Sequence, residues 1–369
     1  MAAVNIGTRR RALFHELEVE SVRPLTADSI EVTFAVPPGL ADDYTYLPGQ
    51  YVALRAHIGE QELRRSYSIC RPPSPGRISV AIKKDLGGRF STWAHESLTA
   101  GDRIDVMSPE GRFTSALPHL DHAHIVGIAA GSGITPMMAV AHTVLGASDT
   151  SRFTLIYTNK SSLDVMFLEE MSELQDRYPA RLALHHVPSR EQRAAPLLSG
   201  RIDAEKLSTM LDVLVPPEHV TEWFLCGPFE LVELCRATLA DRGVPAAAIR
   251  FELFTPAADR IEGDAGRPVV VRPDEPTFSI DFTLDGLTST VETPANGLES
   301  ILNAALRVRP DVPFACAGGV CGTCRARLLV GEVQMTENYA LEPDELERGY
   351  VLTCQSHPKT PIVKVDYDV

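Results

Sequence analysis

The sequence lacks a long hydrophobic segment. No uninterrupted apolar run approaches the ~20 residues that a bilayer-spanning helix needs. The first residues read MAAVNIGTRRRALFHEL. They contain arginines but not the apolar stretch behind them that a secretory signal requires. We therefore expect a cytoplasmic protein without a membrane partner. In that reducing compartment structural disulfides are rare, which favours a metal or redox role for clustered cysteines.

The sequence also lacks an excess of positive charge. Lys and Arg number 35 and Asp and Glu number 49, so the formal net charge is −14. Because nucleic-acid-binding proteins present a basic patch or stripe, we expect no nucleic-acid partner. Residues 268–369 contain 15 acidic and 8 basic side chains, a net charge of −7. This concentration indicates a separate acidic module at the C-terminal end.

Internal repeats and low-complexity tracts are absent, and the pattern of elements changes twice along the chain. Short strands separated by glycine and proline predict an antiparallel barrel that ends near Phe113. Buried strands then alternate with helices, which predicts an α/β domain with a parallel sheet. A linker is predicted at TPAADRIEGDAGRP, before a third segment that opens at FSIDFTLDG. The predicted boundaries are 12–118, 119–255, 256–267 for the linker, and 268–369.

Cysteine is scarce, yet three of the seven cysteines lie within CAGGVCGTC, residues 316–324. Four residues separate Cys316 from Cys321, two separate Cys321 from Cys324, and Cys354 follows after twenty-nine more. The first three match the plant-type run for a [2Fe–2S] cluster, which needs four thiolates. Glycines between them allow tight folding with N–H groups directed at sulfur. A zinc site, which normally shows two separated ligand pairs, and unligated buried thiols are the alternatives.

Two glycine-containing turns follow strands of the middle domain. In GIAAGSGITP, residues 127–136, Gly131 and Gly133 allow backbone N–H groups to approach a phosphate at a helix N-terminus. Alone, this pattern also fits an ordinary tight turn. A second turn, CGP at 226–228, follows another strand, and both turns then lie in the crevice where such sheets bind ligands. The isolated Cys70 and Cys235 are predicted to be small core residues.

The first domain contains RRSYSIC. Strand alternation places Arg65, Tyr67 and Ile69 on one face and Ser66 and Ser68 on the other. An arginine can clamp a pyrophosphate, and a tyrosine can stack on a flat ring. An ordinary amphipathic edge strand is the alternative. A further glycine-rich turn, GGRFS at 87–91, has a hydroxyl suited to a phosphate.

These pieces, in this order, resemble the ferredoxin–NADP reductase superfamily with a C-terminal plant-type ferredoxin domain. The resemblance covers about residues 14–369 and implies a FAD-binding barrel, an NAD(P)-binding domain and a β-grasp ferredoxin domain. It implies that Arg65 binds the FAD pyrophosphate, Tyr67 packs on the isoalloxazine and Ser68 bonds near flavin N5. It also places Cys226 beside the nicotinamide and Phe254, in ELF at 252–254, over the flavin.

The resemblance, with the patterns above, assigns three sets of residues. The catalytic residues are Ser68, Cys226 and Glu252. The cofactor-binding residues are Arg65, Ser66, Tyr67, Ser68, Ala81, Ile82, Lys83, Gly88, Arg89, Phe90, Ser91, Gly131, Ser132, Gly133, Thr135, Asn159, Lys160, Ser161, Cys226, Gly227, Pro228 and Phe254. The metal ligands are Cys316, Cys321, Cys324 and Cys354.

Three further stretches resemble the reductase subunits of phenylacetyl-CoA epoxidases: ELRRSYSICRP, LLSGRIDAEKL and TENYALEPDELERGYVLTCQ. Reductases of ketosteroid and aromatic-ring hydroxylases are the nearest alternatives. The resemblance implies that electrons pass from NADPH to FAD, then to the [2Fe–2S] cluster, then to an oxygenase component, a di-iron epoxidase. The acidic third domain suits a basic partner face. FMN could replace FAD. A redox sensor or binding module without turnover is the alternative from another class, although two nucleotide-site signals argue against it.

The coenzyme is predicted from the loop after RFTLIYTN. An NADH-dependent enzyme usually has a carboxylate there that binds the ribose 2′-hydroxyl. Here Lys160, Ser161 and Ser162 follow, and no acidic residue occurs before Asp164. With the family resemblance, a lysine and two hydroxyls favour a 2′-phosphate, and therefore NADPH. A solvated loop lysine is the alternative, and NADH stays open.

Overall fold

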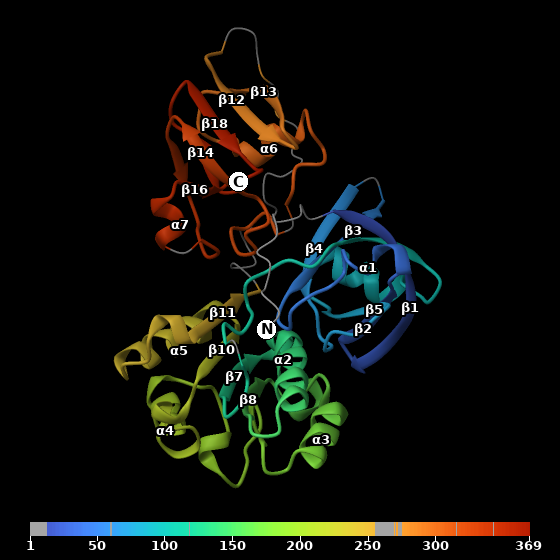
Figure 1. Ribbon diagram of the computed structural model, residues 1–369, viewed down its shortest axis with the longest axis vertical. Coiled ribbons are helices and arrows are strands. Elements are labelled where there is room, and N and C mark those ends of the chain that lie inside the picture. Colours follow the sequence, from blue (N-terminus) through green and yellow to red (C-terminus); the bar gives the residue numbers. More distant parts are fainter. Residues whose placement is uncertain are drawn as a thin grey trace. The chain divides into compact units, whose positions relative to one another are not determined.

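The computed structural model describes residues 13–59, 61–117, 119–254, 275–314, 316–341 and 343–369, with residues 269 and 271. The chain divides into two compact units, of which one is Phe14–Thr255 and the other contains Pro256–Val369. Figure 1 colours the first unit from blue to yellow and the second in orange and red. The predicted linker 256–267 lies outside the described residues.

The first unit begins with the predicted antiparallel sheet. In β1 the buried Leu17 and Val19 alternate with exposed glutamates, the period of two expected when one strand face is covered. The strand order is β4-β3-β6-β1-β2-β5. An isolated bridge between Ile69 and Val80 joins the chain after β4 to β5, so the sheet curls back on itself. The elements are β1 (Phe14–Thr26), β2 (Ser29–Ala35), β3 (Tyr51–Ile58), β4 (Gln61–Ser68), β5 (Arg77–Lys83), α1 (Arg89–Ser97) and β6 (Arg103–Met107).

A five-stranded parallel sheet follows in the same unit, in the order β11-β10-β7-β8-β9. The chain starts in the middle of this sheet at β7, moves outward to β9 and then crosses back to β10. The strand order therefore reverses between β7 and β10, which is where such sheets bind ligands. The elements are β7 (His124–Ala130), α2 (Ile134–Ala147), β8 (Arg152–Asn159), α3 (Leu168–Arg177), β9 (Leu182–Pro188), α4 (Ala204–Leu214), β10 (Glu222–Gly227), α5 (Phe229–Asp241) and β11 (Ile249–Leu253).

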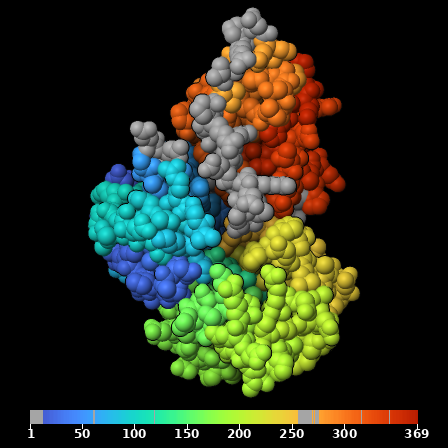
Figure 2. All heavy atoms as spheres, turned by 180° about the vertical axis from the view of Figure 1, so that it is seen from behind, coloured from blue at the N-terminus to red at the C-terminus, as the bar shows by residue number. Residues whose placement is uncertain are grey.

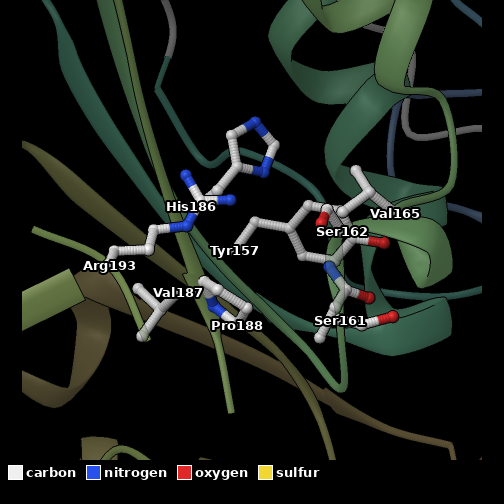
Figure 3. Close-up of a pocket in the computed structure, with 9 residues that line it drawn as sticks. Tyr157, Ser161, Ser162, Val165, His186, Val187, Pro188 and Arg193 are labelled. Atoms are coloured by element: carbon white, nitrogen blue, oxygen red, sulfur yellow. The ribbon is translucent and has the colours of Figure 1, made fainter. Parts of the chain in front are cut away.

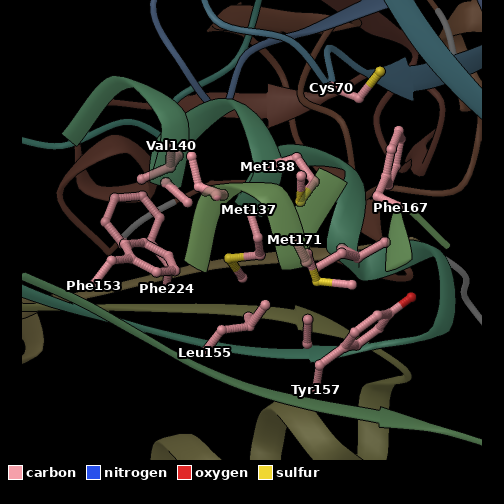
Figure 4. Close-up of a cluster of buried hydrophobic side chains, with 14 of the residues drawn as sticks. Cys70, Met137, Met138, Val140, Phe153, Leu155, Tyr157, Phe167, Met171 and Phe224 are labelled. Carbon is pink, nitrogen blue, oxygen red and sulfur yellow. The ribbon is translucent and has the colours of Figure 1, made fainter. Parts of the chain in front are cut away.

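The two sheets of the first unit share buried contacts and form one continuous body, seen from blue to yellow in Figure 2. The core around α2 is rich in methionine and aromatic side chains, among them Met137, Met171 and Phe153 (Figure 4). Cys70, from the barrel, is fully buried in this same core. Cys235 is buried on α5. Both cysteines are therefore core residues, as predicted.

The second unit is a mixed sheet, in the order β13-β12-β18-β14-β16, with a small β15–β17 ladder beside it. Strands β12 and β18 are parallel and the other pairs are antiparallel, which agrees with the predicted β-grasp domain. Buried Ile301 and Leu302 of α6 belong to the same core as Ile280 and Phe282 of the sheet. The elements are β12 (Thr277–Leu284), β13 (Leu287–Pro294), α6 (Ile301–Leu306), β14 (Arg325–Val330), β15 (Val333–Met335), α7 (Pro343–Glu347), β16 (Tyr350–Leu352), β17 (Ser356–Pro358) and β18 (Ile362–Asp366).

Short 3₁₀ helices connect several of these elements, at 38–40, 131–133, 162–164, 196–198, 217–219 and 246–248. Among the described residues, no helix is long and apolar enough to cross a membrane.

A buried ion-pair network links the barrel to α3. Glu31 on β2 is 5 % exposed and accepts hydrogen bonds from Arg23 at 2.6 Å and from Arg71 at 2.7 Å. Both arginines also pair with Glu170 in the first turn of α3. Burial alone would raise the pKa of Glu31, but the hydrogen bonds and charge of Arg71 and Arg23 lower it below its ordinary value. One buried carboxylate therefore holds both arginines against the helix.

We expect Glu31→Gln to destabilise the protein at pH 7 by roughly 3 kcal/mol, because breaking a buried pair leaves its charged partners uncompensated. The folded-state pKa of Glu31 is depressed, so its stabilisation is present above the unfolded-state pKa of about 4.3 and disappears as the pH falls through the folded value. The difference in thermal unfolding between wild type and variant should therefore shrink below about pH 4.

The matched control is Glu16→Gln, which removes an exposed pair with Arg103 on the same sheet. Exposed pairs contribute only about 0–1 kcal/mol. Equal destabilisation by the two substitutions at pH 7 would contradict the role given to Glu31.

Candidate functional site

The two predicted glycine turns touch each other at the point where the sheet order reverses. A Cβ on Gly133 would lie 2.2 Å from the carbonyl oxygen of Cys226, and one on Gly227 would lie 2.9 Å from the Cβ of Ala130. Gly131 has φ +53°, in the left-handed region that favours glycine. Gly133 and Gly227 therefore allow a close approach of the two turns that a side chain at either position would prevent, whereas Gly131 is needed for its backbone conformation.

The turn after β7 leads into α2 as the sequence predicted. Residues Gly131–Gly133 form a short 3₁₀ helix, and α2 begins at Ile134 with Pro136 in its first turn. The hydroxyl of Thr135 donates to the carbonyl oxygen of Ser132 at 3.0 Å. The hydroxyl of Tyr157 donates to the carbonyl oxygen of Gly131 at 2.9 Å. These bonds fix the loop at a helix N-terminus, which favours a bound phosphate. Thr135 thus shapes the loop through its own hydroxyl.

Three residues predicted to be catalytic come together from different strands. The hydroxyl of Ser68, at the end of β4, donates to the Glu252 carboxylate of β11 at 2.9 Å. Glu252 lies opposite Cys226 in the parallel pairing of β10 and β11. Burial, and then the charge of Glu252, raise the pKa of the Cys226 thiol well above its ordinary value. The thiol is therefore neutral at physiological pH and can contact a ligand ring without acting as a thiolate.

The predicted flavin motif on β4 has an aromatic support. The rings of Tyr67 and Phe90 lie 5.9 Å apart, and Phe90 makes an edge contact with Trp93 at 5.4 Å. Phe90 is 1 % exposed, so it supports Tyr67 from within the core. Trp93 was not predicted, although it lies at helical spacing from Phe90. The hydroxyl of Ser66 is buried without a hydrogen-bond partner, which fits a polar ligand at this strand.

Arg65 and Arg89 are both exposed. The side chain of Arg65 donates to the carbonyl oxygen of Arg64 at 2.7 Å, and that of Arg89 donates to the carbonyl oxygen of Ile58 at 3.2 Å. A guanidinium carries five N–H donors, which is the donor set that suits a phosphate.

Other predicted FAD contacts are used inside the protein. Ala81 and Ile82 are buried side chains of β5, so only their backbone is available to a cofactor. Lys83 pairs with Asp28 at 3.3 Å. The buried hydroxyl of Ser91 accepts from the N–H of Asp85 and donates to Gly88, which closes the GGRFS loop. Ser91 therefore shapes this turn, where Gly88 precedes α1, instead of extending toward a phosphate.

The predicted coenzyme loop after β8 places Asn159 in the interior and Lys160 in solvent. The hydroxyl of Ser161 donates to Asp164 at 2.6 Å, and this hydrogen bond lowers the pKa of the carboxyl. The N–H and hydroxyl of Ser162 both donate to Glu191 at 2.8 Å. The hydroxyls of Ser161 and Ser162 therefore both donate to carboxylates. The sequence analysis did not predict these hydrogen bonds.

Cations near this loop come from the segment after β9, which the sequence analysis missed. Arg193 lies beside His186 on one side of Tyr157, while Ser161 and Ser162 lie on the other (Figure 3). The Nδ1 atom of His186 is buried without a partner, which fits a ligand in this region. A cleft of about 590 Å³ opens beside it and is lined by Ser189, Arg190, Glu191, Gln192, Arg193, Pro196, Ser199 and Gly200. The signal that could have found it is SREQR, residues 189–193, which follows directly after β9.

The four predicted cluster ligands converge in the second unit. Their thiols form two pairs, Cys316 with Cys321 and Cys324 with Cys354, and no group of three or more His, Cys, Asp or Glu among the described residues is arranged to hold one metal ion. A hydrogen bond from Cys316 lowers the pKa of the Cys321 thiol to about 6. The same hydrogen bond raises the pKa of the Cys316 thiol. Two thiol pairs fit a cluster of two irons, which needs four thiolates.

Backbone N–H groups surround the cysteine sulfurs. The N–H groups of Gly318 and Cys321 both lie 3.4 Å from the sulfur of Cys316, and that of Thr323 lies 3.5 Å from the sulfur of Cys321. Gly319 and Gly322 have φ of +80° and +70°, so the loop turns where glycine is required. Such donors stabilise the thiolates that hold an iron–sulfur cluster.

Three family models match the chain in the order of its domains. The oxidoreductase FAD-binding domain matches residues 16–115, the oxidoreductase NAD-binding domain 128–237 and the 2Fe-2S iron-sulfur cluster binding domain 282–359.

Curated relatives cover nearly the whole chain. The chain is 42 % identical to a component of the 1,2-phenylacetyl-CoA epoxidase of Escherichia coli K12, over 96 % of this chain and 98 % of that protein. It is 34 % identical to the ferredoxin reductase component of 3-ketosteroid-9-alpha-monooxygenase of Mycolicibacterium smegmatis, over 96 % and 97 %.

Solved structures share the fold at lower identity. Phthalate dioxygenase reductase aligns with a TM-score of 0.59 at 22 % identity and covers 96 % of this chain and 98 % of its own. The predicted fold class is therefore confirmed. The chain belongs to the ferredoxin–NADP reductase superfamily, as an NAD(P)H-dependent oxidoreductase that carries electrons through FAD to a [2Fe–2S] cluster for an oxygenase.

Proposed function

We propose that this chain is the reductase component of a phenylacetyl-CoA epoxidase and delivers electrons to a di-iron oxygenase component. The supporting observation is the 42 % identity, over nearly the full length of both chains, to a component of that enzyme. A reductase for a ketosteroid monooxygenase is the second candidate, favoured by 34 % identity over a similar length. The cytoplasmic location stays a prediction, as do the residue ranges 12–118, 119–255, 256–267 and 268–369 for the three domains and the linker.

When bound, a nicotinamide coenzyme supplies a hydride, FAD accepts the electron pair, and the cluster takes single electrons onward. The chain positions these groups. The turn of Cys226, Gly227 and Pro228 at the end of β10 contains no charged side chain. Ser68 holds a proton on its hydroxyl, because its bond to Glu252 runs from that hydroxyl to the carboxylate. Buried Cys226 and Leu253 keep water from this end of the sheet.

We assign the flavin to β4 and the turn before α1. Tyr67 would pack on the ring system, because its phenol is already fixed against Phe90. Arg65 and Arg89 would bind the pyrophosphate, Ser66 supplies a buried hydroxyl without a partner, and the backbone of the loop around Gly88 lies at a helix N-terminus.

We assign the pyridine nucleotide to the turns after β7 and β10, through Gly131–Gly133 and Gly227. Phe254, which packs against the core at the end of β11, would cover the flavin. The cluster is assigned to Cys316, Cys321, Cys324 and Cys354, whose two thiol pairs support this ligand set.

We propose NADPH as the coenzyme. Arginines beside the loop support this proposal, whereas the sequence analysis relied on Lys160 and two hydroxyls. Lys160 is exposed, but Arg190 and Arg193 line the cleft beside the loop and can clamp a 2′-phosphate in bidentate fashion. Glu191 already accepts two hydrogen bonds from Ser162. A bound 2′-phosphate would replace this carboxylate, since both are anions that fit the same N–H and hydroxyl.

The proposed function predicts a separation of two activities. With NADPH, the wild type should reduce ferricyanide and should also support epoxidation of phenylacetyl-CoA by the purified oxygenase component of the epoxidase. Cys354→Ser should keep the first activity, which needs only the flavin, and lose the second together with the cluster. The iron content of Cys354→Ser should fall below that of the wild type, which should be about two irons per chain, the content of a [2Fe–2S] cluster.

Cys235→Ser, a buried cysteine outside the ligand set, should keep both activities. Efficient support of a ketosteroid monooxygenase but not of the epoxidase would transfer the assignment to the second candidate. Stoichiometric zinc in the wild type would overturn the cluster.

Arg65→Ala should weaken FAD binding by about 1.5–3 kcal/mol, because a charge-assisted contact to the pyrophosphate is lost. The dissociation constant should therefore rise roughly 10- to 150-fold. Flavin fluorescence during dilution measures it. Arg77→Ala removes an exposed arginine of the same barrel, paired with Glu20, and should leave FAD bound. Full flavin occupancy of Arg65→Ala after dilution would refute the clamp.

Arg193→Ala should lower kcat/KM for NADPH on the order of 10- to 100-fold and change kcat/KM for NADH little, because only NADPH has a 2′-phosphate for the guanidinium to bind. Lys160→Ala should have a smaller effect in the same direction. The control is Arg152→Ala, an exposed arginine at the opposite end of β8. A wild type that prefers NADH, or an unchanged coenzyme ratio in Arg193→Ala, would exclude this site for the 2′-phosphate.

A further inference from the structure

Ala317, the residue after the first proposed cluster ligand, has a backbone conformation that L-amino acids rarely adopt. Its φ is +52°, in the left-handed region, where its Cβ crowds the following carbonyl oxygen. Glycine would avoid this crowding, and the chain has glycine at the next two positions but alanine here. Other contacts must therefore hold Ala317 in this conformation.

The side chain of Gln355 makes such a contact. Gln355 follows the fourth proposed ligand, Cys354, and its Nε2 donates to the carbonyl oxygen of Ala317 at 2.9 Å. Its Oε1 accepts a hydrogen bond from the hydroxyl of Thr336 at 2.8 Å. Because a carbonyl oxygen only accepts, these two partners fix which way the amide points. Thr336 also donates its backbone N–H to the carbonyl oxygen of Gln355 at 2.9 Å, so the two residues are paired twice.

The left-handed turn at Ala317 directs the next peptide toward sulfur. The N–H of Gly318 lies 3.4 Å from the sulfur of Cys316, which also receives the N–H of Cys321 at 3.4 Å. Rotation of Ala317 into an ordinary conformation would turn the Gly318 N–H away. Hydrogen bonds to the sulfurs are among the features that set the potential of an iron–sulfur cluster, because they stabilise its more negative, reduced form.

We propose that Gln355, oriented by Thr336, is a positioning residue that holds Ala317 in the left-handed conformation and thereby sets the reduction potential of the cluster and its resistance to iron loss. Gln355 acts through the backbone of the loop and does not ligate iron. The inference rests on the proposed ligand set of Cys316, Cys321, Cys324 and Cys354.

The test uses the full-length chain with FAD and cluster. In Gln355→Ala the midpoint potential, from a dithionite titration followed by EPR, should shift to a lower value, and a chelator should remove iron faster. NADPH-dependent ferricyanide reduction should stay unchanged. Gln355→Glu keeps the acceptor for Thr336 but loses the donor, so it should shift in the same direction. Gln334→Ala, which changes an exposed glutamine of β15, should match the wild type.

The Ala317→Gly substitution distinguishes loss of the positioning contact from general damage to the cluster loop. Glycine adopts positive φ without a steric cost, so this substitution in the Gln355→Ala background should return the potential and the resistance to chelator toward wild-type values. If Gln355→Ala loses its cluster during purification, a cluster retained by the double variant supports the proposal.

Two results would overturn the inference: wild-type potentials in both Gln355→Ala and Gln355→Glu, or a double variant as perturbed as the single one. A wild type without the EPR signal of a reduced [2Fe–2S] cluster would overturn the ligand assignment as well, so the two failures can be told apart.

Discussion

The direct backbone contact between the turns after β7 and β10 is the constraint on which the candidate site depends. No Cβ can fit at Gly133, because the carbonyl oxygen of Cys226 would lie 2.2 Å from it. With the turns in contact, the parallel register places Glu252 beside Cys226, and the hydrogen bond from Ser68 brings the end of β4 to the same place. Ser68 and Glu252, which are 184 positions apart, thus meet next to the strand whose end turns against Gly133.

Features encoded within a few consecutive residues could be predicted from the sequence. The cysteine spacing indicated a cluster loop, and the turns at 131–133 and 226–228 indicated a crevice at the reversal of strand order. The alternation of strands and helices indicated three domains with different sheets. Each of these depends on local spacing, strand period or the special conformations of glycine. The structure confirms the three different sheets, while the domain boundaries and the binding roles stay predictions.

Interactions between distant segments could not be predicted in the same way. Ser91 looked available for a phosphate, but in the folded loop its hydroxyl is used by Asp85 and Gly88. Arg193 lies thirty-three residues beyond Lys160, and only the pairing of β8 with β9 brings their loops together. The ion pair between Arg71 and Glu170 joins residues ninety-nine positions apart. A single sequence contains no register between strands, so such partners stay hidden.

Polar side chains from outside the motifs hold two of the predicted binding loops in shape. Glu191 accepts hydrogen bonds from the N–H and the hydroxyl of Ser162, so a carboxylate holds the predicted coenzyme loop in shape. In the cluster loop the outside side chain donates a hydrogen bond, whereas Glu191 accepts two. There Gln355 holds a carbonyl oxygen so that the neighbouring N–H groups stay directed at sulfur. In both loops a side chain from outside the motif is hydrogen-bonded to the motif, so the motif residues alone do not fix the conformation of the loop.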